Sequence, residues 1–425
     1  MSTKTTYKQT ELGLIPEDWE VKKLGEILKE YSLGGNYENN SEESGIPLIK
    51  MGNIGRGKID LSKIEYLPKN VNYSKNDILK YNDILFNTRN TLDLVGKVSI
   101  WKNEALFALY NSNLLRLYFK EDFVENNDYV NFQFNSEITL ANLKKYATGT
   151  TSVAAIYTKD LLKLKFLLPP LPEQKKIADC LSTWDVAIEK QSQLINVLTD
   201  RKKALMQQLL TGKKRLPGFS GEWKEVKLGS ICENFQNGNA FSAKDYKKTG
   251  IPIVTMGNIN LGGYFYFSES KSNFWIEDKS LERYEIKKGD LIIAMTDVTP
   301  EKNLIGLTSI IDIDRIFYLN QRVGHIILKP KLADTDFIFY LSQNSYWRNQ
   351  CKAFATLGVQ ANLGTNDIKN INIKLPPIEE QTAIAEILAT ADRELTLQKE
   401  KLAQLQTQKK GLMQVLLTGK KRLLN

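Results

Sequence analysis

The sequence predicts an α+β protein in which two mixed α/β domains are joined by two long helices that pack as an antiparallel coiled coil. Two observations carry this prediction. Nearly the same nine residues occur twice, as IPLIKMGNI at 46–54 and as IPIVTMGNI at 251–259. A heptad pattern of apolar residues also occurs twice, once in the middle of the chain and once at its end. The two copies begin 205 residues apart. A repeat of that period indicates a duplicated domain with pseudo-two-fold symmetry, because solenoid repeats are only about 20–50 residues long.

Three further blocks recur in the same order in both halves and show where the repeat begins and ends. EDWEVKKLGEI near the start matches GEWKEVKLGSI at 221–231, PPLPEQKKIADCLSTWD at 169–185 matches PPIEEQTAIAEILATAD at 376–392, and LMQQLLTGKKRL at 205–216 matches LMQVLLTGKKRL at 412–423. We therefore divide the chain into a first domain (1–168), a central helical region (169–212), a second domain (213–375) and a C-terminal helical region (376–425).

The two helical regions carry the strongest local signal. Prolines at 169, 170 and 172 end the preceding structure, and a helical pattern runs from Glu173 to Thr211, where Gly212 supplies a left-handed cap. Apolar residues recur in alternating steps of four and three, which is the spacing of a coiled-coil seam. The seam consists of Ile177, Leu181, Trp184, Ile188, Ile195, Leu198, Leu205 and Leu209 in the first copy and of Ile384, Leu388, Leu395, Leu402, Leu405, Leu412 and Leu416 in the second.

Polar residues interrupt the seam at equivalent places: Gln191 and Lys202 in the first copy, Gln398 and Lys409 in the second. They either fix the register of a helix pair or lie at the edge of the seam with their polar ends in water. A lone helix of roughly 58 Å with one apolar stripe needs a partner, and the other copy supplies it. Two domains at opposite ends of such a pair, related by pseudo-two-fold symmetry, call for antiparallel helices.

The remaining regions, 1–168 and 213–375, contain short apolar alternations separated by turns rich in Gly, Asn and Asp. DILFNTRN, KVSIWKN and NLLRLYFK are predicted strands in the first domain, as are DLIIAMTD, LTSIIDID and GHIILKP in the second. DYVNFQFNSEITLANLKKYA and DFIFYLSQNSYWRNQCKAFA have helical spacing. Each domain is therefore predicted to mix helix and strand, and the pattern does not give the strand order.

Composition limits the class of protein. The 425 residues carry a net charge of +9, which permits binding to a polyanion without requiring it. No apolar run is long enough to span a membrane, and the first residues, MSTKTTYKQTELG, lack the apolar stretch of a signal peptide. Cys180, Cys232 and Cys351 have neither metal-ligand spacing nor an even number. We expect a cytoplasmic protein that makes no membrane contact.

The sequence offers little from which to build a catalytic centre. Its one histidine, His325, takes the place of Arg116 in the first copy and is predicted on a strand surface or in a satisfied core. There is no GxxxxGK[ST] phosphate loop, no helix-opening GxGxxG and no Asn-Pro-Pro-Tyr motif of DNA amino-methyltransferases. A triplet such as Glu285-Ile286-Lys287, with Asp278 upstream, arises by chance in so basic a chain. We expect no catalytic residue, no metal site and no cofactor bound by this chain.

The loops differ most between the copies, and they are basic, amide-rich and aromatic. Arg, Asn and Gln pair bidentately with base edges, whereas Lys, Ser and Thr suit phosphates. Keeping the strands and changing the loops is what reading two different half-sites of DNA requires, and ordinary drift of polar loops is the alternative. The predicted DNA contacts are Asn53, Arg56, Lys58, Arg89, Asn90, Lys97, Thr150, Thr151, Ser152, Asn258, Asn260, Thr296, Lys302, Gln321, Arg322, Gln360 and Asn362.

Basic segments follow both helix ends, at Lys213–Arg215 and at Lys420–Arg422. Cations at a helix C-terminus are stabilised by the helix dipole. We interpret both segments in this way, with direct contact to DNA as the alternative.

Several motifs occur together over essentially the full length of the chain. They are the paired Pro-Pro-x-x-Glu-Gln helix openings at 169–174 and 376–381, the LMQxLLTGKKRL endings, the IPxxxMGNI segments and the DIL and DLI strands. In this combination the chain resembles the specificity subunits of type I restriction–modification systems. The resemblance implies two target-recognition domains, each reading one half of a split DNA target, and a helix pair that sets the gap between the halves.

The resemblance also implies the partners. The helix pair is expected to dock two methyltransferase subunits, which hold S-adenosylmethionine, and a translocating restriction subunit that uses ATP and Mg is expected to join them. This chain would be the non-catalytic, DNA-binding member of the complex. Two alternatives from other classes remain: a self-contained DNA-cleaving enzyme, and a coiled-coil scaffold without DNA specificity. The recognised bases cannot be derived from the sequence.

Overall fold

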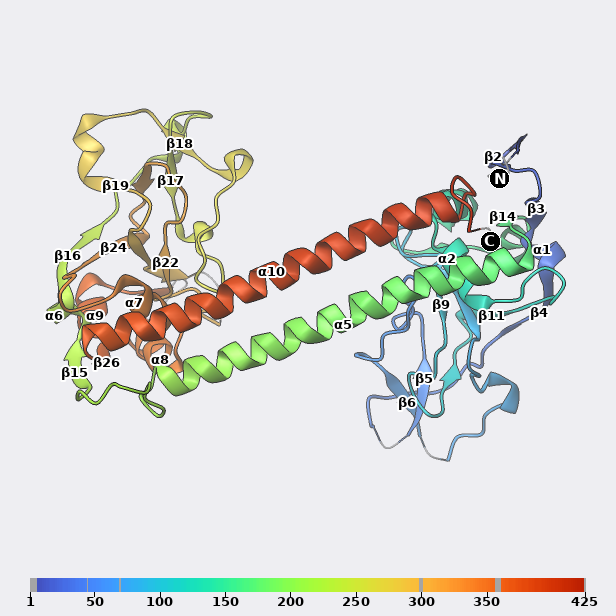
Figure 1. Ribbon diagram of the computed structural model, residues 1–425, viewed down its shortest axis with the longest axis horizontal. Helices are drawn as coiled ribbons and strands as arrows, with labels where there is room; N and C mark the ends of the chain where they lie inside the picture. The colour runs from blue at the N-terminus through green and yellow to red at the C-terminus, as the bar shows by residue number, and fades with distance from the viewer. Residues whose placement is uncertain (1–5, 44, 69, 298–300, 356–360, 424–425) are drawn as a thin grey trace. The chain divides into compact units, whose positions relative to one another are not determined.

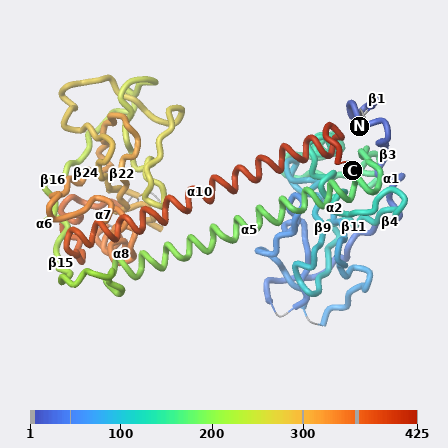
Figure 2. Tube along the Cα trace, in the orientation of Figure 1, coloured from blue at the N-terminus to red at the C-terminus, as the bar shows by residue number. Residues whose placement is uncertain are grey.

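The computed structural model describes residues 6–43, 45–68, 70–297, 301–355 and 361–423. Contacts divide the chain into two compact units (Figure 1): unit 1 comprises residues 1–192 and 400–425, and unit 2 comprises residues 193–399. Each long helix therefore contributes one half to each unit. The described ends of the chain lie side by side in unit 1 (Figure 2), where Tyr7 Oη donates a hydrogen bond to the Gly419 carbonyl at 3.2 Å.

Unit 1 is built on a four-stranded antiparallel sheet with two helices beside it. In spatial order the strands are β4 (Leu28–Leu33), β11 (Leu114–Phe119), β7 (Ile84–Asn87) and β9 (Val98–Ile100), and the helices are α2 (Asn127–Phe134) and α3 (Glu137–Tyr146). A smaller sheet has the order β10 (Leu109–Tyr110), β5 (Ile46–Ile49) and β6 (Glu65–Leu67), with β5 and β10 parallel.

Unit 2 repeats this plan. Its main sheet has the order β16 (Cys232–Asn237), β24 (Val323–Leu328), β20 (Leu291–Ala294) and β22 (Thr308–Ile310), followed along the chain by α7 (Thr335–Ser342) and α8 (Ser345–Phe354). The smaller sheet has the order β18 (Phe274–Trp275), β17 (Ile251–Val254), β23 (Phe317–Leu319) and β19 (Glu285–Ile286). The strands and helices predicted from apolar spacing are confirmed in both units.

A two-stranded antiparallel pair leads into each long helix. In unit 1 it joins β3 (Glu20–Lys23) to β14 (Lys165–Leu168), and in unit 2 it joins β15 (Lys224–Lys227) to β26 (Asn372–Leu375). The short elements around these pairs are β1 (Tyr7–Thr10), β2 (Gly13–Pro16), α1 (Leu24–Ile27), α4 (Thr158–Leu161), α6 (Leu228–Ile231) and α9 (Thr365–Lys369).

The long helices are α5 (Leu171–Leu209) and α10 (Ile378–Leu416), each of 39 residues. Both helices begin two residues before their predicted starts at Glu173 and Glu380, so that Pro172 lies inside α5. Proline is tolerated there because the first turn of a helix has no intrahelical partner for its N–H groups. Gly212 and Gly419 follow the helix ends with φ of +70° and +71°. This left-handed conformation confirms the predicted glycine caps.

In both units the halves of α5 and α10 run antiparallel, and charged pairs fix their register. In unit 1, Lys409 Nζ lies 2.6 Å from Asp185, and in unit 2, Lys202 Nζ lies 2.5 Å from Asp392. The same number of residues separates Asp185 from Lys202 on α5 and Asp392 from Lys409 on α10. Both ion pairs therefore belong to one antiparallel register. The seam lysines therefore form cross-helix ion pairs rather than extending into water, which decides between the two interpretations of these positions.

The predicted seam is covered along its length. All of its residues are buried or half-buried, and the ends are the most deeply buried: Ile177 and Leu181 with Leu416 in unit 1, and Ile384 and Leu388 with Leu209 in unit 2. These residues belong to the main apolar core of their unit. Each unit therefore shares one core with its own halves of the two helices, and burial of that apolar surface stabilises the attachment.

A buried glutamate in the first turn of each long helix ties together three separate parts of the chain. Glu173 accepts hydrogen bonds from Trp19 Nε1 at 3.0 Å and from Arg422, whose Nε and Nη2 each lie 2.7 Å away. Glu380 is bound in the same way by Trp223 at 3.1 Å and by Arg215. We call each set a glutamate junction. Burial of Glu173 and Glu380 is affordable only because each carboxylate has a bidentate arginine partner.

The glutamate junctions change the interpretation of the basic segments. Arg215 and Arg422 were interpreted as cations that interact with the dipole of the helix they follow. Instead, each binds the carboxylate at the start of the other long helix. Arg422 also binds Asp18 at 2.7 Å, and its guanidinium lowers the pKa of the Asp18 carboxyl.

The glutamine of each Pro-Pro-x-x-Glu-Gln motif holds the turn that precedes the helix. Gln174 Nε2 donates to the carbonyls of Pro169 and Phe123, and Gln381 Nε2 donates to those of Pro376 and Leu332. Proline has no backbone N–H to donate, but its carbonyl still requires a hydrogen-bond donor. The glutamine side-chain amide supplies that donor. The motif is therefore a structural junction between domain and helix.

His325 lies on β24 with its side chain 12% exposed, and its Nε2 lies 3.7 Å from Asp290 Oδ1. Arg116 takes the equivalent place on β11 and binds Asp83 at 3.0 Å. Burial lowers the pKa of His325, with the nearby Asp290 opposing the shift. The predicted strand position of this histidine is confirmed, and its side chain is largely shielded from solvent.

We predict that Arg422→Ala destabilises unit 1 by about 3–5 kcal/mol, because it leaves the buried Glu173 carboxylate without a countercharge. Arg215→Ala is expected to lower the stability of unit 2 by a smaller amount, since Arg215 is 30% exposed and water reaches this ion pair. Native-state hydrogen exchange of peptides from each unit measures both effects. Lys421→Ala is the matched control, because Lys421 is exposed and such changes usually stay within about 0.5 kcal/mol. Equal protection in Arg422→Ala and Lys421→Ala would contradict the prediction.

Candidate nucleic-acid interface

In unit 1 the structure brings predicted DNA contacts from distant segments into one small sheet. β8 (Arg89–Asn90) pairs with β13 (Ala154–Ala155), which pairs with β12 (Thr148–Gly149). The turn between β12 and β13 carries Thr150, Thr151 and Ser152, all exposed. The Leu92 amide donates to the Thr151 carbonyl, which holds this turn beside the loop after β8.

The loop after the MGN segment reaches the same place. Arg56 Nη2 lies 3.4 Å from the carbonyl of Asp93, in the loop that follows β8. Burial lowers the pKa of the Arg56 guanidinium. Lys97 lies at the end of that loop and is half-buried. Arg56, Arg89, Asn90 and the 150–152 turn therefore form a group of polar and basic side chains on adjoining loops, as a DNA-reading surface requires.

Unit 2 has the corresponding arrangement. β21 (Thr296–Asp297) pairs with β25 (Ala361–Asn362), with Thr296 opposite Asn362. The Leu363 amide donates to the Met295 carbonyl, and the Met295 amide donates to the carbonyl of Arg322. Gln321 and Arg322 are exposed beside this pair. The structure therefore brings Gln321, Arg322 and Asn362 together, and the predicted contact Gln360 lies outside the described residues.

Two predicted contacts, Asn53 and Asn258, have their amide groups occupied within the protein. Asn53 is 2% exposed; its Oδ1 accepts the Lys50 amide at 2.9 Å, and its Nδ2 donates to the Asp60 carbonyl at 2.9 Å. Asn258 makes the same two bonds, to the Thr255 amide and the Tyr266 carbonyl. The repeated MGN asparagine therefore shapes its loop, and we replace the predicted DNA contact by this role.

Two other predicted contacts are partly withdrawn from solvent, and a third, Lys58, is exposed but contacts a long helix. Thr296 is 8% exposed, and its hydroxyl lies 3.0 Å from Met256 Sδ. Lys302 is half-buried with φ of +50°, and its carbonyl accepts a bond from Arg348. Lys58 lies 3.6 Å from Asp185 on α5. Four predicted contacts in unit 2 are exposed, namely Asn260, Gln321, Arg322 and Asn362, and the Oδ1 of Asn260 accepts the amides of Gly262 and Tyr264.

The polar groups that hold these loops to the helices were not predicted from the sequence. They are Asp185 and Asp392 on the helices, Tyr264 on the loop after the second MGN segment, and Tyr340 on α7. A signal was present, since Asp185 and Asp392 end the repeated block at the same position. The apolar period of the block does not reveal this signal, because the two aspartates are polar and lie outside the apolar seam.

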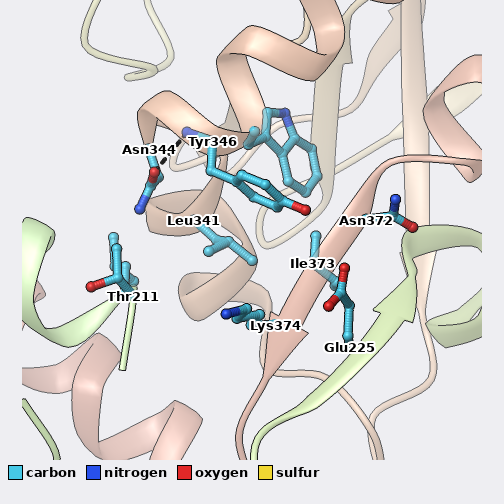
Figure 3. Close-up of a pocket in the computed structure, with 10 residues that line it drawn as sticks. Thr211, Glu225, Leu341, Asn344, Tyr346, Asn372, Ile373 and Lys374 are labelled. Carbon is cyan, nitrogen blue, oxygen red and sulfur yellow. Dashed lines mark hydrogen bonds between the residues drawn. The ribbon is translucent and has the colours of Figure 1, made fainter. Parts of the chain in front are cut away.

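A cavity of about 370 Å³ lies in unit 2 (Figure 3). Leu341 and Ile373 form an apolar lining, Tyr346 stands over them, and Glu225 and Lys374 face each other across β15 and β26. Thr211 Oγ1 donates to the main-chain carbonyl of Gln207 at 2.6 Å.

Two searches of the described residues bear on other functions. No group of three or more His, Cys, Asp or Glu side chains among them is arranged to hold a metal ion. Within the same residues, no helix is both long enough and apolar enough to cross a membrane.

Comparison with known proteins identifies the repeated unit. The family model described as the type I restriction modification DNA specificity domain matches residues 16–200 and matches again at residues 220–407. The chain belongs to this family. The two matches coincide with the two copies of the repeat, so the chain contains two specificity domains.

Similar specificity subunits span the whole chain. The putative type I restriction enzyme MjaX specificity subunit of Methanocaldococcus jannaschii is 30% identical and aligns with 97% of this chain and 96% of its own length. The EcoKI specificity subunit of Escherichia coli strain K12 is 22% identical, over 88% of this chain and 82% of its own.

Solved structures agree at the level of the fold. A crystal structure of the S subunit of a type I restriction–modification system from M. genitalium superposes with a TM-score of 0.56 at 15% identity, covering 94% of this chain and 96% of that one. A structure reported in a study of complex assembly and conformational transition of the type I R-M system gives a TM-score of 0.57 at 15% identity, covering 96% of this chain and 99% of that one. At this identity the likeness shows that the specificity-domain fold is shared.

We predict that Asn53→Ala destabilises the first specificity domain by about 1–3 kcal/mol, because the Lys50 amide and the Asp60 carbonyl lose their buried partner. Asn258→Ala is expected to cost the second domain less, since Asn258 is only half-buried. Hydrogen exchange of the Lys50 and Thr255 amides reports each loss directly. Gln321→Ala, at an exposed side chain, is the control. Unchanged exchange at Lys50 in Asn53→Ala would show that the amide does not shape the loop.

Proposed function

We propose that this chain is the DNA-reading subunit of a type I restriction–modification complex. Each specificity domain reads one half of a split double-stranded target through the loops described above, and the helix pair sets the gap between the halves. The observation that carries the proposal is the pairing of two family domains with two different loop sets on one repeated framework. A framework that is kept while its loops change suits the reading of an asymmetric sequence.

The charge and the side chains of the loops support this proposal. The chain has a net charge of +9, exposed Arg89 lies on β8 beside β13, and exposed Arg322 adjoins the β21–β25 pair, where its carbonyl accepts the Met295 amide. Arginine pairs bidentately with guanine in the major groove, and lysines and hydroxyl groups place a protein on the phosphates. The turn at Thr150–Ser152 is suited to the second task.

The proposed partners follow from family membership. We propose that the helix pair docks two methyltransferase subunits and that restriction–translocase subunits complete the complex. S-adenosylmethionine, ATP and Mg would be held by those partners, and this chain would supply recognition without catalysis. The complex would act in the cytoplasm, where its DNA target lies.

The two alternatives make different predictions for the purified chain. A self-contained DNA-cleaving enzyme would cut DNA alone when Mg²⁺ is added. A scaffold without DNA specificity would bind no duplex with sequence preference. Family membership supports neither alternative. A chain that neutralises several phosphates is distinguished from the scaffold by affinity that falls steeply as salt is raised, and from the nuclease by the absence of cleavage.

We predict that Arg89→Ala relaxes discrimination at one half-site and that Arg322→Ala relaxes it at the other. Each change is expected to cost about 1–3 kcal/mol of binding free energy on the preferred sequence, because a base-reading arginine loses two hydrogen bonds. Binding by the assembled methyltransferase complex to DNA carrying changes in one half-site at a time measures the effect. Lys331→Ala, at an exposed residue of unit 2 outside the reading loops, is the control. Equal losses on all sequences would show that the arginines contact phosphates instead.

We predict that shortening both helices by one facing heptad, residues 190–196 and 397–403, moves the preferred gap without changing the half-site sequences. A heptad is about 10.5 Å of helix, or about three base pairs at 3.4 Å each. The seam keeps its phase, because a heptad restores nearly the same face of the helix. Methylation of DNA molecules with varied spacers measures the preferred gap.

The control for this experiment deletes one heptad from α5 alone. That variant is expected to lose the facing register of the helices and with it stable folding of the pair. An unchanged gap preference in the double deletion, in a complex that still methylates DNA, would show that the helix pair does not set the gap.

A further inference from the structure

The loop after each MGN segment closes as a small hairpin, and one residue occupies the same place in both copies. In unit 1 the hairpin is closed by the bridge between Ile54 and Ile59, and in unit 2 by the bridge between Ile259 and Phe265. Lys58 directly precedes Ile59, and Tyr264 directly precedes Phe265. Both side chains contact the repeated aspartate of the long helices. Lys58 and Tyr264 are therefore structural equivalents.

In unit 2 this contact is a compact network. Asp392 accepts hydrogen bonds from Tyr264 Oη at 2.6 Å and from Tyr340 Oη at 2.8 Å, and Lys202 Nζ lies 2.5 Å away. Lys202 Nζ also donates to Tyr264 Oη at 2.9 Å and lies over both tyrosine rings. The side chains of Lys202 and Asp392 are only 12% and 16% exposed. Hydrogen bonds to a shielded carboxylate are stronger than bonds between neutral groups.

In unit 1 the same network lacks both hydroxyl groups. Asp185 binds Lys409 at 2.6 Å, and Lys409 lies over the ring of Phe132, 4.9 Å from its centroid. Phe132 has the position on α2 that Tyr340 has on α7, so phenylalanine replaces tyrosine. The loop contacts α5 through Lys58, whose ammonium lies 3.6 Å from Asp185 and whose side chain is 55% exposed. Within the domain, Asn131 Nδ2 also donates to the Gly57 carbonyl at 3.0 Å and Ser99 Oγ to the Lys58 carbonyl at 2.8 Å. Exposed ion pairs of this kind contribute little and are screened by salt.

We propose that Lys58 and Tyr264 are positioning residues that couple each reading loop to the helix pair, by a salt-sensitive contact in unit 1 and a salt-resistant one in unit 2. The loops concerned carry predicted DNA contacts. Arg56 lies two residues before Lys58, and Asn260 Oδ1 accepts the Tyr264 amide at 3.1 Å. Each loop is thereby fixed at one point along the helices that set the gap. This role in recognition rests on the proposed function, whereas the contacts themselves do not.

The first experiment tests the contacts in the free full-length chain, without DNA. Hydrogen exchange is measured for the loops at 55–59 and 259–265 in low salt and in about 1 M NaCl, where the screening length is about 3 Å. The loop in unit 1 is expected to exchange two- to fivefold faster in high salt, and the loop in unit 2 is expected to be unchanged. An equal response of the two loops would overturn the proposal.

Single substitutions locate the cause. Lys58→Met keeps the length of the side chain but removes its charge. At every salt concentration, its loop is expected to exchange at the rate that the wild-type loop shows in high salt. Tyr264→Phe is expected to raise exchange of its loop about tenfold in low and high salt alike, because a hydrogen bond to a charged group is lost. Tyr266→Phe is the matched control, since Tyr266 is a half-exposed tyrosine on the same loop. A Tyr264→Phe loop that exchanges like the control would overturn the proposal.

The second experiment tests the role in recognition with the assembled methyltransferase complex. Tyr264→Phe is expected to widen the range of gap lengths that are methylated, whereas a merely structural role would lower methylation equally at every gap. Phe132→Tyr, which adds a hydroxyl beside Asp185 without touching the loop, is expected to leave the range unchanged. Altered exchange with an unchanged range would overturn the positioning role while leaving the proposed function intact. Failure of the wild-type complex to read DNA would instead reject the proposed function.

Discussion

The antiparallel pairing of the two long helices is the constraint on which the rest of the structure depends. Each helix presents one apolar stripe, and its only complementary stripe within the described residues lies on the other copy of the repeat. Charged pairs at Lys202–Asp392 and Asp185–Lys409 fix the register, since a shift of either helix would separate buried charges. The glutamate junctions then anchor each helix start to a domain and to the segment that follows the other helix.

Function follows from attaching variable loops to this constant framework. The strand order of the main sheet is the same in both units, and the MGN asparagine makes the same two bonds in each loop. The loops differ in sequence between the copies, and so do the residues where the loops meet the helices. A domain built in this way can change the sequence that it reads without changing how it is held.

The difference between the two loop contacts shows how a duplicated site diverges. Tyr340 and Phe132 differ by one hydroxyl group, and Tyr264 and Lys58 differ in whether they hydrogen-bond to the aspartate or lie near it as a charge. The aspartate–lysine pair that both contacts share is unchanged, because losing either member would leave a buried charge unpaired. At this site the two copies therefore differ around the charged pair and keep the pair itself.

The sequence by itself determined the repeat, the two long helices with their seam, the glycine caps and most strands, because each is encoded by a local period or by a residue with a special backbone requirement. Tertiary structure alone decided the roles of isolated polar residues. Asn53 was predicted to contact DNA but is enclosed by its own loop, and Arg422 was assigned to a helix dipole but binds Glu173. Polar side chains bind whatever partner lies within about 3 Å, and that neighbour comes from distant parts of the chain that no local pattern describes.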